Sequence, residues 1–153
     1  MKILFVCTGN TCRSSMAGAV AGSLLEGRPG CQNIVFKSAG VAAIAGQPAT
    51  REAVTALAEM GIDLGWHRAV QLTPEAVSQA DLVLTMTSAH QQHVRKLVPS
   101  QTGKIFTLSG YAGTNSDIPD PIGQPLEAYR ACARRLMDLI GKVLDRLGDT
   151  SSQ

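Results

Sequence analysis

The 153-residue sequence lacks a long apolar run. A helix that spans a bilayer needs roughly 20 consecutive apolar residues, and no stretch approaches that length. A secretory signal is not expected either, because the apolar run that begins at Ile3 gives way to a polar loop within a few residues. The sequence therefore predicts a cytoplasmic protein without a membrane partner.

The chain also has little net charge and few cysteines. Its formal net charge is +2 and charges of both signs are scattered, so the composition gives no case for a nucleic-acid partner. The four cysteines do not combine with nearby histidines at the spacing of metal ligands, so we predict no metal site and no cofactor. In a reducing compartment these cysteines are expected to be thiols. The sequence makes no prediction of oligomeric state.

Short apolar runs alternate with amphipathic segments along the chain. The pattern predicts strands at 2–6, 34–38, 81–86 and 104–107, and helices at 15–26, 48–60, 73–80, 88–98 and 125–147. Strands that alternate with helices indicate a parallel sheet with helices on both faces. We therefore expect a three-layer α/β fold of the doubly wound type, with four parallel strands in a single domain over residues 1–153.

The ends of these elements carry further expectations. Ser88 is expected to cap the helix that follows it, and the polar tail 148–153 is expected to fray. The last helix should bury a stripe formed by Leu126, Tyr129, Ala133, Leu136, Ile140, Val143 and Leu147. Residues 108–124 show no periodicity, and a structureless loop of that length is often functional.

The loop between the first strand and the first helix, residues 7–14, holds a thiol and a guanidinium. Cys7 and Arg13 are separated by five residues. A loop that turns backbone N–H groups inward at a helix N-terminus binds anions, and such a site favours the thiolate form of a cysteine. The planar fork of Arg13 can hold two phosphate oxygens at once. The residues thus suggest a nucleophile and a phosphate cradle in one turn.

Other residues of the loop fit this hypothesis. Gly9 allows close approach of the backbone, Asn10 can brace the loop, and Ser14 can donate its hydroxyl to the sulfur. The plainer alternative remains open at this point, because a cysteine after an apolar strand is more often a small buried hydrophobe. Arg13 at a helix start, however, is disfavoured by the helix dipole unless an anion is bound.

The long loop at 108–124 offers an acid for the leaving group. Asp120 lies between Pro119 and Pro121, which restrict its backbone and hold its carboxyl group in place. We favour Asp120 as the general acid, and then as the base for the hydrolytic water, over Asp117.

These residues resemble a known family. The run from Cys7 to Ser14 after an N-terminal strand, with Asp120-Pro121 late in the chain, is similar to the low-molecular-weight protein tyrosine phosphatases, and the similarity covers essentially the whole chain. The resemblance implies hydrolysis of phosphorylated protein substrates through a cysteinyl-phosphate intermediate, without metal.

The resemblance also implies the roles of single residues. Cys7 is the nucleophile and Asp120 the acid. Phosphate is bound by residues of one loop: Thr8, Gly9, Asn10, Thr11, Cys12, Arg13 and Ser14. The loop is supported by Asn10, Ser14, Ser38 and His67.

Thr11 bears on the substrate. Phosphotyrosine members of the family usually carry an aliphatic residue at this position, whereas the bacterial branch that acts on phosphoarginine resembles this chain in having threonine. A hydroxyl can contact a guanidinium nitrogen, and one polar atom in a pocket can discriminate strongly between substrates. We therefore favour phosphoarginine over phosphotyrosine. Ser15, where the family often has proline, and Ile122, where many members place an aromatic residue, are departures from the family pattern.

Cys12 is a candidate redox partner. It lies five residues from Cys7, and a reversible disulfide between them would protect the nucleophile from irreversible oxidation. The alternative is that Cys12 only fills space beneath the loop.

Two other functions use the same loop. An arsenate reductase of this fold needs further cysteines after the third strand, and residues 82–100 contain none. A non-catalytic phosphopeptide-binding module needs Arg13 but neither Cys7 nor Asp120, and both are present.

Overall fold

The structure is a computed structural model that describes residues 1–31 and 33–151. Its elements in chain order are β1 (Lys2–Cys7), α1 (Arg13–Leu25), β2 (Val35–Gly40), α2 (Arg51–Ala58), α3 (Pro74–Gln79), β3 (Leu82–Thr85), α4 (Ser88–Leu97), the 3₁₀ helix η1 (Pro99–Lys104), β4 (Ile105–Thr107), α5 (Leu108–Tyr111) and α6 (Leu126–Ser151).

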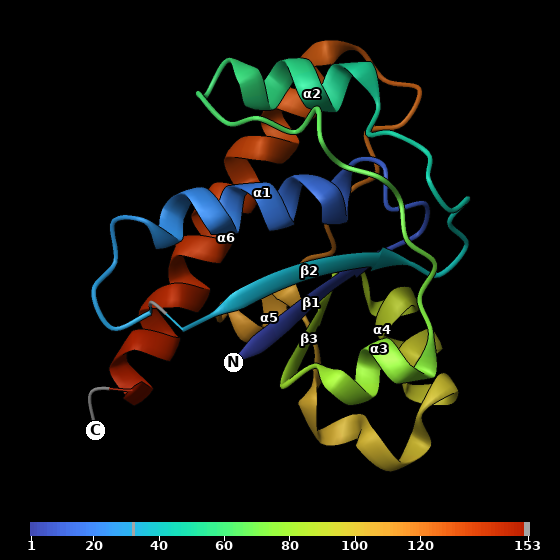
Figure 1. Cartoon of the computed structure of the whole chain (residues 1–153), viewed down its shortest axis with the longest axis vertical. Helices are drawn as coiled ribbons and strands as arrows, with labels where there is room; N and C mark the ends of the chain where they lie inside the picture. The colour runs from blue at the N-terminus through green and yellow to red at the C-terminus, as the bar shows by residue number, and fades with distance from the viewer. Residues whose placement is uncertain (32, 152–153) are drawn as a thin grey trace.

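The four strands form one parallel sheet in the order β2-β1-β3-β4. Phe5 in β1 is in register with Ser38 of β2 and with Leu84 of β3, and Leu84 is in register with Phe106 of β4. Helices α1 and α6 lie on one side of the sheet and α3 and α4 on the other (Figure 1). The predicted α/β fold with a four-stranded parallel sheet is therefore confirmed.

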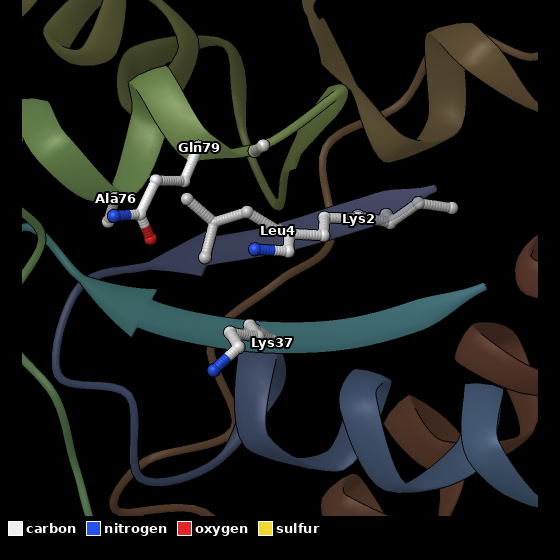
Figure 2. Close-up of a pocket in the computed structure, with 7 residues that line it drawn as sticks. Lys2, Leu4, Lys37, Ala76 and Gln79 are labelled. Atoms are coloured by element: carbon white, nitrogen blue, oxygen red, sulfur yellow. The ribbon is translucent and has the colours of Figure 1, made fainter. Parts of the chain in front are cut away.

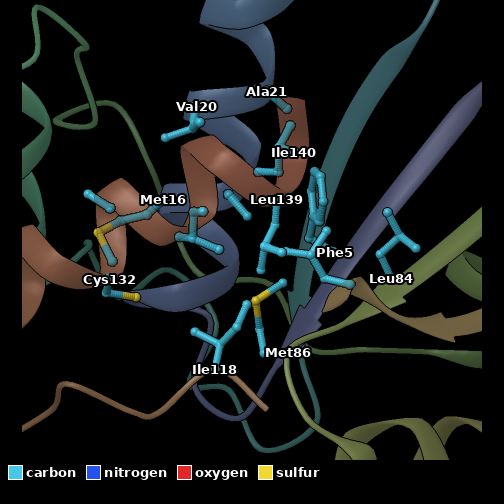
Figure 3. Close-up of a cluster of buried hydrophobic side chains, with 14 of the residues drawn as sticks. Phe5, Met16, Val20, Ala21, Leu84, Met86, Ile118, Cys132, Leu139 and Ile140 are labelled. Atoms are coloured by element: carbon cyan, nitrogen blue, oxygen red, sulfur yellow. The ribbon is translucent and has the colours of Figure 1, made fainter. Parts of the chain in front are cut away.

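Side chains of β1 alternate between two cores, as the pleat of a strand requires. Ile3 and Phe5 point into the larger core, which α1, α2 and α6 close (Figure 3). Leu4 and Val6 point into the smaller core, with residues of α3 and α4. The predicted stripe of α6 is buried in the larger core, except that Leu126 is only partly buried. Both faces of the sheet are thus covered, as the near-continuous apolar sequence of β1 demands.

The order of the strands reverses at β1. From β1 the chain crosses to β2 on one side, and it later returns to β3 on the other side. In such sheets, ligands bind beyond the carboxyl ends of the strands at the reversal. Cys7 is the last residue of β1, so the loop that follows it lies at this position.

Three expectations about the ends of elements were wrong. Thr87, not Ser88, caps α4, with its side chain accepting from the backbone N–H of His90. A short helix, α5, occupies the start of the segment expected to lack structure, because Thr107 caps it. Helix α6 continues to Ser151 instead of fraying after Leu147, and Gly148 packs near Cys31. Residues 152 and 153 of the expected tail lie outside the described residues.

The described helices include none that is long and apolar enough to cross a membrane.

Gly40, the last residue of β2, lies against the backbone of the Cys7 loop, and this contact predicts an effect on stability. A Cβ on Gly40 would overlap the carbonyl oxygen of Thr8 and lie 3.0 Å from the backbone nitrogen of Asn10. We expect Gly40→Ala to lower the free energy of unfolding by about 1–3 kcal/mol, because backbone atoms have little room to shift. Urea denaturation measures the change.

Gly22, exposed in α1, provides the control. A Cβ there meets nothing within 4 Å, so Gly22→Ala should raise the free energy of unfolding by about 0.5–1 kcal/mol. Equal stability of Gly40→Ala and the wild type would contradict the close approach.

Candidate active site

Cys7 lies at the base of the loop, buried at 2% exposure. Its Sγ is 2.8 Å from Ser14 Oγ and accepts from the backbone N–H of Asn10 at 3.3 Å. The Asn10 amide donates to Ser14 Oγ at 2.8 Å, so the Ser14 hydroxyl hydrogen is free to point at the sulfur. Two hydrogen-bond donors are therefore within reach of the sulfur.

Asn10 connects the loop to the rest of the fold. Its φ of 60° is left-handed, and no other non-glycine residue in the described chain has a positive φ. The side chain donates to Ser38 Oγ at 2.9 Å and accepts from the backbone N–H of Val70 at 2.9 Å. The backbone carbonyl of Asn10 lies 2.6 Å from Nε2 of His67. Asn10, Ser38 and His67, singled out from the sequence, thus form one network.

His67 is held as a neutral donor in this network. Burial lowers the pKa of His67, and the charge of Arg68 lowers it further, although the bond to Asn10 opposes both effects. Because a carbonyl oxygen can only accept, Nε2 carries the hydrogen that the Asn10 carbonyl receives.

Arg13 is the first residue of α1 and is buried at 5% exposure. Its Nη1 donates to the carbonyl of Ile118 at 3.0 Å, and its Nη2 lies 3.4 Å from Oδ2 of Asp120. Its Nε is buried without a hydrogen-bond partner in the described structure. An unpaired buried donor of this kind is costly and rare, so the site is built for a further acceptor.

The N-terminus of α1 also presents hydrogen-bond donors that lack an acceptor. Cys12 occupies the cap position without a capping hydrogen bond from its side chain, and the first turn contains no acidic residue. The first N–H groups of a helix have no partner within the helix, and they carry partial positive charge. Together with the free Nε of Arg13, they form a site for an oxyanion such as phosphate.

Asp120, rather than Asp117, is the carboxylate beside Arg13. Its Oδ1 accepts from the backbone N–H of Ile122 at 3.0 Å and from the thiol of Cys12 at 3.6 Å. Asp117 instead accepts from the backbone N–H and the hydroxyl of Ser88, at 2.9 and 3.2 Å. The two aspartates therefore have separate positions, one in the site and one at the start of α4.

The remaining predicted loop residues line the same turn. Burial raises the pKa of the Cys12 thiol, and the Asp120 carboxylate raises it further, so Cys12 is a neutral thiol at physiological pH. Thr11 is buried at 7% exposure, and its carbonyl accepts from the backbone N–H of Thr50. A Cβ on Gly9 would lie 3.6 Å from Oγ1 of Thr11, so the Thr11 hydroxyl faces Gly9.

Two contacts of the loop were missed from the sequence. Nε2 of the buried His90 lies 2.8 Å from Oγ1 of Thr8, and the Ile118 carbonyl accepts from Arg13. Neither carries a local signal, because 82 and 105 residues separate the partners.

The described part of the chain offers little for a ligand outside the loop. The described residues include no group of three or more histidine, cysteine or acidic side chains that could hold a metal. An apolar pocket of about 60 Å³ lies between β1 and α3 and is lined by Leu4, Lys37 and Ala76 among others (Figure 2). Its β1 residues, Lys2 to Leu4, precede Cys7 by several positions, so this pocket is separate from the loop.

The network around Asn10 generates a prediction of stability. Asn10→Ala removes the side-chain bonds to Ser14, Ser38 and Val70 and puts alanine at a left-handed φ. We expect the free energy of unfolding to fall by about 2–4 kcal/mol, measured by urea denaturation.

Asn10→Gly separates the two causes. Glycine adopts a positive φ without strain, so this variant should lose the hydrogen bonds alone and be less destabilised than Asn10→Ala. The role of the network in stability would be disproved if both variants had the same urea midpoint of unfolding as the wild type.

Comparison with known proteins agrees with this geometry. The family model described as low molecular weight phosphotyrosine protein phosphatase matches residues 2–153. The chain is similar to a protein-arginine-phosphatase of Geobacillus stearothermophilus, with 44% identity over 95% of each chain. It is also similar to the probable low molecular weight protein-tyrosine-phosphatase EpsP of Ralstonia nicotianae, with 43% identity over 83% of this chain and 82% of the relative.

A solved structure of YwlE arginine phosphatase from Geobacillus stearothermophilus superposes with a TM-score of 0.90 at 41% identity, covering 97% of this chain and 94% of the other. Similarity of this extent, across almost the whole of both chains, establishes common descent as well as common fold. The chain therefore belongs to the low molecular weight phosphotyrosine protein phosphatase family of cysteine-dependent enzymes.

Proposed function

We propose that this protein hydrolyses phosphoarginine in proteins through a cysteinyl-phosphate intermediate. The observation that carries the chemistry is the convergence on one loop of a buried thiol and an unpaired guanidinium nitrogen, with a carboxylate beside them. The observation that favours arginine is the polar side chain of Thr11, buried in that loop.

In the first step, the thiolate of Cys7 attacks phosphorus. The guanidinium of Arg13 and the first N–H groups of α1 bind the phosphoryl oxygens and stabilise the charge that develops on them. The bond from phosphorus to the leaving nitrogen breaks, and Asp120 gives its proton to that nitrogen. Ser14 stabilises the sulfur as the thiolate before attack.

In the second step, water attacks the cysteinyl phosphate. Asp120, now a carboxylate, takes a proton from this water, and the bond from sulfur to phosphorus breaks. Inorganic phosphate and the Cys7 thiolate are the products. Because Asp120 is 3.4 Å from Arg13, the acid lies next to the group that holds the phosphate.

The substrate preference rests on residues 11 and 122. An isoleucine or valine at position 11 would give a phenol ring an apolar surface, whereas the threonine hydroxyl can bond with a guanidinium nitrogen or with water. Ile122 is 50% exposed, and it has no aromatic face on which a phenol ring can stack. Thr11 thus favours a guanidinium substrate, whereas Ile122 weakens the case for a stacked phenol and does not by itself indicate arginine.

Phosphotyrosine hydrolysis is the second candidate function. It is supported by the relative from Ralstonia nicotianae, whose 43% identity almost equals the 44% of the arginine phosphatase. The arginine phosphatase aligns over 95% of this chain and the tyrosine phosphatase over 83%, which favours the first.

Variants of Thr11 test the substrate preference. We expect Thr11→Val to reduce the ratio of kcat/KM for phosphoarginine peptides to kcat/KM for phosphotyrosine peptides by roughly tenfold or more, since it removes the hydroxyl and keeps the volume. Thr11→Ser, which keeps the hydroxyl, should preserve the ratio within a few-fold. Thr11→Ile should lower the ratio at least as much as Thr11→Val. A wild type that prefers phosphotyrosine would refute the proposal for arginine.

Variants of Cys7 and Asp120 test the chemistry. Cys7→Ser should reduce turnover by several orders of magnitude, whereas Cys31→Ser, whose thiol lies against Leu144, should not. Asp120→Asn should slow release of a guanidine by about 10²- to 10⁴-fold, and release of an activated phenol by less, because only the more basic leaving group depends on the acid. Equal loss with both leaving groups would count against Asp120 as the acid.

A further inference from the structure

The first turn of α4 contains a histidine with both ring nitrogens engaged. His90 is only 7% exposed, although it is the third residue of the helix. Its Nε2 lies 2.8 Å from Oγ1 of Thr8, and its Nδ1 lies 2.9 Å from Oγ1 of Thr87. The ring therefore bridges the cap of α4 and the residue that follows Cys7.

The Thr8 hydroxyl lies between His90 and Arg13 and contacts both side chains. Nη2 of Arg13 lies 3.5 Å from Oγ1 of Thr8, on the same guanidinium nitrogen that approaches Asp120. A guanidinium can only donate, so Oγ1 of Thr8 is the acceptor in this pair and its own hydrogen must go elsewhere. Nε2 of His90 is positioned to accept that hydrogen.

This assignment fixes the state of the imidazole. If Nε2 accepts, the ring is neutral and carries its hydrogen on Nδ1, which donates to Oγ1 of Thr87. Burial lowers the pKa of His90 to about 4, and the charge of Arg13 acts in the same direction. Asp117 and Asp120 oppose this shift, and His93 on the same helix adds to it. The ring is thus neutral at physiological pH, as the bridge requires.

The same turn of α4 also holds the loop that carries Asp120. Asp117 accepts from the backbone N–H and the hydroxyl of Ser88, and Ile118 donates its N–H to the carbonyl of Met86. Residues 86–90 therefore contact both loops that form the site. His90 is the member of this segment that reaches the phosphate loop.

We infer that His90 is a positioning residue, which orients the Thr8 hydroxyl and through it the guanidinium of Arg13, and so fixes where the phosphoryl group binds. The inference rests on the proposed phosphatase chemistry at Cys7 and holds for either phosphoamino acid. It does not require His90 to contact substrate.

Two amide variants separate the contacts of the ring. A glutamine amide reaches the position of Nε2 and an asparagine amide the position of Nδ1. We therefore expect His90→Asn to keep the contact with Thr87 and lose the contact with Thr8. His90→Gln should restore the contact with Thr8.

The probe is inorganic phosphate, whose dissociation constant is measured by calorimetry on the full chain and does not depend on turnover. We expect His90→Asn to weaken phosphate binding by about tenfold, and His90→Gln to remain within about threefold of the wild type. In steady-state assays, kcat/KM should follow the same order. His93→Asn, an exposed position on the same helix, is the control and should match the wild type.

A cycle with Thr8→Val tests the pathway. If His90 acts through Thr8, the double variant Thr8→Val, His90→Asn should bind phosphate no more weakly than Thr8→Val alone. Additive losses of phosphate affinity in the double variant would overturn the inference. So would an equal loss of phosphate affinity in His90→Asn and His90→Gln that follows their loss of stability in urea, because His90 would then have only a structural role.

The two proposals fail in different ways. A wild type that binds phosphate but releases none from phosphopeptides would refute the proposed function, while the phosphate measurements would still decide the role of His90. A wild type that turns over normally, with His90→Asn unchanged in phosphate binding, would refute the role of His90 alone.

Discussion

The left-handed turn at Asn10 is the constraint on which the site depends. A positive φ is unfavourable for most residues, and asparagine tolerates it because its short amide can bond to nearby backbone. Here the amide bonds to Ser14, Ser38 and Val70 at 2.8–2.9 Å. These contacts are each worth about 1 kcal/mol, enough together to offset the cost of the turn. The turn directs the backbone N–H of Asn10 at the Cys7 sulfur, so the conformation of Asn10 determines one of the hydrogen bonds to the proposed nucleophile.

A second constraint is the contact of Arg13 with the segment that carries Asp120. One nitrogen of its guanidinium is used by the Ile118 carbonyl, which holds the 117–120 segment against the helix, and the others face the site. The guanidinium that is proposed to bind phosphate therefore also helps to set the position of Asp120, the proposed acid. A lysine could not do both, because its single nitrogen has no fixed fork. The contacts of Arg13 with Ile118 and Asp120 help to offset the unfavourable position of its charge at a helix N-terminus.

The sequence was sufficient where the signal is local. Short apolar runs predicted the four strands, and their alternation with helices predicted the parallel sheet. The spacing of Cys7 and Arg13 indicated the loop between the first strand and the first helix. It was insufficient where a short element or a backbone atom decides the structure. Helix α5 has only four residues, which are too few to show a periodic pattern. The Ile118 carbonyl has no side-chain signature, so its bond with Arg13 could not be read from residue types. The sequence around His90 gives no sign of its contact with Thr8, because the two residues are far apart in the chain and only the fold brings them together.

The contacts within the loop separate Thr11, on which the proposed substrate preference rests, from the residues that hold the loop together. Asn10, Arg13 and Ser14 are tied to one another or to distant segments through their side chains, so replacing any of them disturbs the cradle as a whole. Thr11 is anchored differently, because its backbone carbonyl accepts from Thr50, and this bond survives any change of side chain. Its side chain faces Gly9, across the loop rather than into the supporting network. On the proposed function, a substitution at residue 11 is therefore expected to change the surface that the leaving group meets and to leave the oxyanion site in place. Because the anchoring of Thr11 depends on its backbone and not on its side chain, the proposed change of substrate preference at this position does not require any change in the contacts of Asn10, Arg13 or Ser14.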